Sequence, residues 1–187
     1  MISPTRPTET RMSGTAPALR RLYFVRFGFA LVWAGLLALT ASDLGIAAGV
    51  LLVLYPLFDV GAAVFDARTS RTRELVFNIV VSSLAAVGLA LAATSGIPAA
   101  LRVWGLWAIL AGVIQLVVAL RRRRLGGQWP MIASGGLSTL VGVSFIATAA
   151  KDDPSLTNLA GYAVAGGVFF LISAVRLGRA ARTAGGR

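Results

Sequence analysis

The chain lacks the two side chains that carry most metal, redox and acid–base chemistry in proteins. None of its 187 residues is cysteine or histidine. Without cysteine there is no disulfide, thiolate nucleophile or iron–sulfur ligand, and without histidine the usual haem or copper ligand and the usual general base are missing. We therefore expect no metal, no cofactor and no enzymatic activity.

Acidic residues are scarce as well. The chain has 7 Asp and Glu against 18 Lys and Arg, a formal net charge of +11. Of these acids, Asp59 alone lies inside an apolar stretch, with Asp66 and Glu74 near the end of it. An intramembrane aspartyl protease needs two carboxylates that face each other, and this distribution does not supply them.

Long apolar stretches are what the chain has in abundance, since 57% of its residues are hydrophobic and 13% are charged. About 20 apolar residues in a helix cross the hydrocarbon layer of a membrane. The apolar runs are continuous, without the alternation of barrel strands, so they predict helices. The expected fold is all-α, an integral membrane bundle of six transmembrane helices. The predicted spans are residues 22–41, 45–65, 75–94, 99–120, 129–149 and 156–176.

The six spans read as three copies of one hairpin, over residues 22–68, 75–121 and 129–176. A glycine recurs in the first helix of each copy, at Gly35, Gly88 and Gly142. An aromatic residue recurs in the second helix, at Tyr55, Trp107 and Tyr162. In each copy small residues follow the aromatic one, and then an alanine and an arginine. We interpret residues 20–178 as one membrane domain.

Two shorter segments flank this domain. Residues 1–19 are rich in Ser, Thr and Pro without an apolar period, which predicts a disordered cytoplasmic lead. Residues 179–187 form a basic cytoplasmic tail. We interpret the first apolar run as an uncleaved span, because it is long for a signal peptide and no cleavage site ends it.

The arginines set the expected orientation, because positive loops are retained in the cytoplasm. Every Lys and Arg except Arg102 and Lys151 falls at one end of the predicted hairpins. We expect a multi-pass membrane protein with both termini in the cytoplasm. Its partners would be the lipid bilayer and anionic lipids at the arginine-rich loops. The charge requires no nucleic acid.

Asp59 is the main candidate functional residue, because a carboxylate inside a span is costly unless it is paired, protonated or hydrated. Arg26 lies at a similar depth and is the candidate partner. One interpretation is structural, with Arg26 reaching toward the interface and Asp59 orienting the first hairpin. The other makes Asp59 a proton-responsive group. Gln115 is a weaker polar candidate in the second repeat.

The glycines favour helix packing, because small residues one turn apart let backbones approach closely in lipid. This interpretation covers Gly45, Gly49, Gly112, Gly135, Gly142 and Gly167. Aromatic residues near span ends are typical of the interfacial belt. We assign to that belt Trp104, Trp107, Trp129, Tyr23 and Tyr162.

Three phrases carry a family resemblance, at residues 106–115, 129–143 and 161–167. Placed in a three-hairpin repeat, they resemble the HdeD-like family of bacterial acid-resistance membrane proteins over residues 20–180. The resemblance implies a six-span inner-membrane protein linked to survival of acid stress, with no catalytic residues to carry over. The arginine-rich loops and the Ser/Thr/Pro-rich lead depart from the family pattern.

Three hypotheses follow. The first is a non-enzymatic HdeD-like protein that supports acid-stress resistance or membrane integrity. The second is a small transporter or channel that uses Asp59 and Arg26. The third is a scaffold that binds partner membrane proteins, or further copies of the chain in a homo-oligomer, through its small-residue faces.

Overall fold

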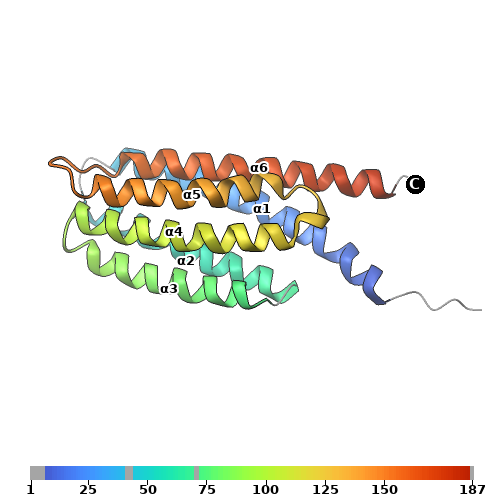
Figure 1. Ribbon diagram of the computed structural model, residues 1–187. Helices are drawn as coiled ribbons and strands as arrows, with labels where there is room; N and C mark the ends of the chain where they lie inside the picture. Colours follow the sequence, from blue (N-terminus) through green and yellow to red (C-terminus); the bar gives the residue numbers. More distant parts are fainter. Residues whose placement is uncertain (1–6, 41–43, 70–71, 186–187) are drawn as a thin grey trace, which may run out of the picture.

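The computed structural model describes residues 7–40, 44–69 and 72–185 (Figure 1). These residues form six α-helices and one 3-10 turn, and they contain no strand. Each of the six helices holds a segment long and apolar enough to cross a membrane. The chain is an all-α, multi-pass membrane protein. Its helices are α1 (Pro7–Thr40), α2 (Ile46–Thr69), α3 (Arg73–Ala92), α4 (Ile97–Arg121), α5 (Trp129–Thr148) and α6 (Thr157–Gly185), with the turn η1 (Arg123–Leu125) after α4.

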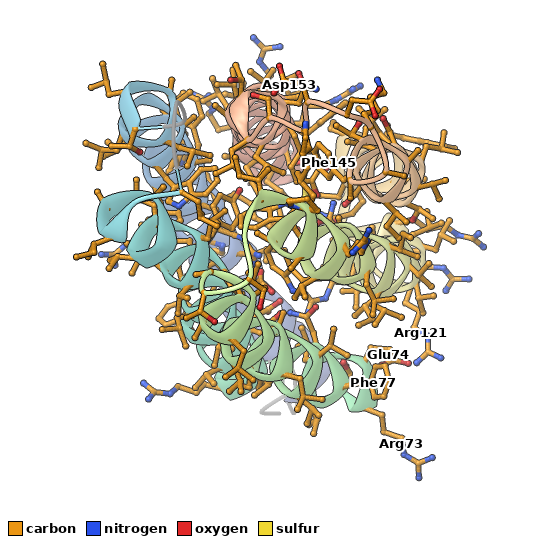
Figure 2. The ribbon with its side chains drawn as sticks, turned by 90° about the vertical axis from the view of Figure 1, so that its left-hand side faces the viewer. Arg73, Glu74, Phe77, Arg121, Phe145 and Asp153 are labelled. Atoms are coloured by element: carbon orange, nitrogen blue, oxygen red, sulfur yellow. The ribbon has the colours of Figure 1, made fainter. Side chains whose placement is uncertain are left out.

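Successive helices run antiparallel and pack in a ring that α6 closes against α1 (Figures 1 and 2). The most extensive contacts join α4 to α5, α1 to α6 and α2 to α3. All three contacts join helices of different repeats, α1 and α6 joining the first repeat to the third, and the two helices within a repeat contact each other less. Each repeat therefore completes its packing against its neighbours. We call the end at which α1 begins and α6 ends the arginine-rich end, and the other the opposite end.

Glycines make the α4/α5 contact close. A β-carbon on Gly142 would lie 2.6 Å from the carbonyl oxygen of Gly105, and one on Gly112 would lie 2.8 Å from that of Gly135. At the α1/α6 contact, a β-carbon on Gly167 would lie 3.2 Å from that of Ala30. No larger residue fits these α4/α5 positions without a shift of the backbone, because the nearest atom that its β-carbon would meet is a backbone carbonyl oxygen of the facing helix.

The last two glycines of the packing prediction, Gly49 and Gly45, make no such close contact. A β-carbon on Gly49 would meet that of Ala93 at 3.5 Å, an ordinary contact. Gly45 has no packing neighbour among the described residues, because a β-carbon there would meet none of their atoms within 4 Å. Gly45 directly precedes α2, at the opposite end of the bundle, where the next residue, Ile46, is 90% exposed.

The lead segment also differs from its prediction. The sequence predicts disorder over residues 1–19, yet α1 begins at Pro7. Proline suits the first turn of a helix, where no N–H donor is needed. A helix whose apolar part is held by packing also extends at little further cost, since its nucleus already exists. Residues 1–6 lie outside the described part of the chain. At the other terminus, α6 continues through the basic tail to Gly185.

Several aromatic residues assigned to the interfacial belt are buried instead. Trp104, Trp107 and Tyr23 lie in the bundle interior, whereas Trp129 is 70% exposed. The reason is mutual packing: in the half of the bundle toward the opposite end, ring centroids of Trp33, Tyr55, Trp104 and Trp107 lie 4.7 to 5.9 Å apart. An aromatic ring is buried readily when neighbouring helices supply other rings against it.

Candidate functional site: a buried carboxylate centre

Asp59 lies in the interior of the bundle and is 5% exposed. Its Oδ1 atom accepts a hydrogen bond from the guanidinium of Arg26, and the two side chains form an ion pair between α2 and α1. The structure thus brings together the two residues that the sequence singled out. Depth alone indicated this pairing, because both residues lie a few turns inward from the arginine-rich end.

The other carboxylate oxygen is held by α3. Asn78 Nδ2 and Ser82 Oγ donate to Asp59 Oδ2 at 2.7 and 2.8 Å. Trp107 Nε1 of α4 in turn donates to Ser82 Oγ at 3.0 Å. We did not predict Asn78 or Ser82 as site residues. Their spacing of one helical turn, which puts both on one face of a span, was the available signal.

Arg26 is enclosed from a second direction. Its Cζ atom lies 4.7 Å from the ring centroid of Phe170 in α6, a cation–π arrangement. Side chains from α1, α2, α3, α4 and α6 therefore meet around one carboxylate. The charges in this centre are compensated by a counterion, neutral donors and an aromatic face, which is how a membrane interior accommodates ionisable groups.

Gln115 joins the remaining helix to this region. Its Nε2 atom donates to the carbonyl oxygen of Met131 in α5 at 3.2 Å. It also lines, with Asp59 and Arg26, both of the cavities that lie in the bundle interior. The weaker sequence candidate is thus close to the ion pair.

Two cavities of about 70 and 80 Å³ adjoin at the ion pair. The first extends between α4, α5 and α6, where Ser138 Oγ is hydrogen-bonded to the hydroxyl of Tyr162. The second extends toward the arginine-rich end. Cavities of this size have room for water molecules, which would hydrogen-bond to the polar groups among the lining residues.

A second ion pair lines the cavity on the arginine-rich side. Asp66 of α2 accepts two hydrogen bonds from Arg122, at 2.7 and 3.1 Å, and both side chains are largely buried. Beside it the hydroxyl of Tyr23 lies 3.5 Å from Gln128 Oε1. At the rim of the bundle, Glu74 pairs with Arg121, and Figure 2 shows these two side chains next to each other, with Arg73 extending away.

The loop between α4 and α5 is fixed against α6 at this end. Ser173 Oγ donates to the carbonyl oxygen of Gly127 at 3.0 Å, and Gln128 Nε2 donates to that of Gly126 at 3.2 Å. Gly127 has a φ of +66°, a conformation that favours glycine. A β-carbon there would also lie 3.0 Å from the backbone nitrogen of Leu177. The loop thus positions Gln128 among the residues that line the second cavity.

Between the polar centre and the opposite end, the interior of the bundle is filled by aromatic and aliphatic side chains. Trp33, Leu37, Leu89, Leu101 and Trp104 are essentially inaccessible. Trp33 Nε1 donates to the carbonyl oxygen of Leu51 at 2.7 Å, which ties α1 to α2. Polar residues that line the second cavity extend to the arginine-rich end. A layer of buried rings and leucines separates the two cavities from the opposite end.

The arrangement defines the chain as a six-helix membrane protein with a buried carboxylate–guanidinium centre. Among the described residues, no three His, Cys, Asp or Glu side chains are grouped so that they could hold a metal ion. Comparison with protein-family models, with curated proteins and with solved structures gives no match. The centre holds one buried carboxylate that accepts hydrogen bonds from a guanidinium and from two neutral side chains.

Proposed function

We propose that this chain is a non-enzymatic protein of the bacterial inner membrane that supports survival of acid stress, with both termini in the cytoplasm. The observation that carries the proposal is the placement of Asp59. It is the buried carboxylate on which partners from α1 and α3 converge, and both cavities reach it. The resemblance of residues 20–180 to the HdeD-like family supports the link to acid stress.

Protonation of Asp59 is the event that couples acidity to the bundle. A neutral carboxyl group no longer balances the charge of Arg26, which would then lie in the interior without its counterion. Through the hydrogen bonds that it accepts, this group links α2 to α1 and α3. A change in its charge therefore changes how these helices pack, without a histidine.

The orientation rests on the arginines. Among the described residues, the arginines at one end of the helices include Arg20, Arg21, Arg68, Arg73, Arg122 and Arg124, while Arg102 and Lys151 lie at the other end. Positive loops are retained in the cytoplasm, and this rule supports a cytoplasmic position for the arginine-rich end. With this orientation, protons from the cytoplasm would reach Asp59 through the second cavity.

A small transporter is the second candidate, and the two adjoining cavities favour it. They would give an ion or a small polar molecule a path over half the bundle. The layer around Trp33, Leu37 and Trp104 would then have to open. Proton or ion flux in liposomes that contain the purified protein separates the candidates, since the stress-resistance function predicts flux no higher than in empty liposomes.

Survival and internal pH of a deletion strain after acid challenge test the main proposal. The strain is complemented with the native chain, with Asp59→Asn, or with Asp153→Asn, which removes an exposed acid as a matched control. We expect the native chain and the control to restore both readings, and Asp59→Asn to fail at equal membrane abundance. Full rescue by Asp59→Asn would refute the role of Asp59. A deletion without phenotype would refute the stress function and favour a scaffold.

A further inference from the structure

An open groove of about 400 Å³ lies on the outside of the bundle between α1 and α2, near the arginine-rich end. Its walls are apolar and come from both helices, and Arg21 stands at its mouth. The lining residues are Arg21, Leu22, Val25, Phe58, Gly61, Ala62 and Phe65. We propose that this groove is a binding site for one anionic phospholipid, which places an acyl chain along the wall and its head group at the arginine.

The shape of the groove fits one acyl chain. The α2 wall runs from Phe58 to Phe65, about 10 Å along the helix axis at 1.5 Å per residue. Gly61 opens the middle of this wall, because a β-carbon there would meet no atom within 4 Å. The contact between α1 and α2 is also less extensive than that between α1 and α6. The gap between the two helices is thus left for an apolar chain to fill.

The charge at the mouth specifies the head group. Arg21 is exposed, and no ion pair of the described side chains involves it or Arg68. Arg68 follows Gly61 and Phe65 on the same face of α2, one turn nearer the membrane surface. The neighbouring acid, Asp66, is turned inward to Arg122. Arg21 therefore lines the end of an apolar slot, Arg68 lies one turn beyond it on α2, and neither has a counterion among the described residues, which matches a lipid phosphate above its acyl chain.

The site also explains a difference between neighbouring arginines. Arg20 lies over the ring of Phe24, with its Cζ atom 5.4 Å from the centroid, and packs against Gly178 of α6. Arg21, the next residue, faces the groove on the side of α2. Arg20 thus packs within the protein, whereas Arg21 binds lipid at its surface.

Lipid binding to the purified chain, measured by native mass spectrometry in detergent, tests the inference. The probes are phosphatidylglycerol and phosphatidylcholine with the same acyl chains. We expect the native chain to bind one phosphatidylglycerol more tightly than phosphatidylcholine. Arg21→Gln should weaken that binding about fivefold, as expected for one arginine near an anionic surface. Gly61→Leu should weaken it at least as much, because the new side chain fills the slot.

Two matched variants control for charge and for volume. Arg73→Gln removes an exposed arginine from the same end but outside the groove, and Gly136→Leu enlarges a glycine on α5 that also has no neighbour within 4 Å. Both should bind phosphatidylglycerol as the native chain does. Equal affinity for the two lipids, or equal losses in the test and control variants, would show nonspecific lipid contact and overturn the site. Because Arg21→Gln leaves the packed helix faces intact, the test does not depend on the folding of Gly61→Leu.

Discussion

Gly112 of α4 and Gly135 of α5 approach each other reciprocally: a β-carbon on either residue would lie 2.8 Å from the carbonyl oxygen of the other. Gly105 and Gly142 repeat the relationship two turns away, at 2.6 Å in both directions. Both pairs lie between successive sequence repeats. The close contact of α4 with α5 is therefore built from four glycines in two facing pairs.

Substitution of one of these glycines should destabilise the bundle. We expect Gly135→Ala to lower the free energy of unfolding by about 1–3 kcal/mol, the usual cost of overpacking. The measurement is thermal or denaturant unfolding in detergent. Gly136→Ala is the matched control, because it adds the same methyl group on the same helix where no atom lies within 4 Å. Equal stability of the two variants would contradict the packing argument.

The sequence predicts the six spans well because span length and composition are properties of local segments. It also predicts the depth of Arg26 and Asp59, and hence their pairing. It does not predict which faces meet. Asn78 and Ser82 were overlooked because single small polar residues are tolerated in spans, and the buried Trp104 resembles an interfacial anchor until its neighbours are known. Ring closure between α1 and α6 depends on contacts that hydropathy does not record.

The ion pair of Arg26 and Asp59 should couple energetically. Asp59→Asn keeps the shape of the side chain but leaves Arg26 without its counterion, and we expect a loss of about 3 kcal/mol of stability. Arg26→Gln should also destabilise the protein. The double variant should lose less than the sum of the two, by about 1–3 kcal/mol, because neither charge then remains alone.

A double-mutant cycle in detergent, measured at neutral pH, checks this coupling. Asp153→Asn and Arg102→Gln form the control cycle, since both are exposed and lie at the opposite end. The control residues should contribute additively. Additive losses for Arg26 and Asp59 as well would mean that the pair does not stabilise the bundle.

Trp33 and Trp104 provide a matched comparison of a satisfied and an unsatisfied indole. Both are almost fully buried, and their rings stack with centroids 5.3 Å apart. Trp33 Nε1 donates to Leu51, whereas Trp104 Nε1 has no hydrogen-bond partner among the described residues. We expect Trp33→Phe to cost about 1 kcal/mol more than Trp104→Phe, because only the first substitution loses a hydrogen bond. Unfolding of both variants in one detergent measures the difference, and a greater loss for Trp104→Phe would contradict it.

Membrane orientation can be tested without removing any background thiol, because the chain contains no cysteine. The variants Asp153→Cys and Ala180→Cys place one thiol each at exposed positions of the two ends. If the arginine-rich end lies in the cytoplasm, a membrane-impermeant maleimide applied to cells with a permeabilised outer membrane should label Asp153→Cys. It should label Ala180→Cys only after the inner membrane is disrupted. Labelling of both variants in disrupted membranes is the control for thiol reactivity. The reverse pattern in intact cells would place Asp59 and its cavity on the outer side, so that external protons would reach the carboxylate first.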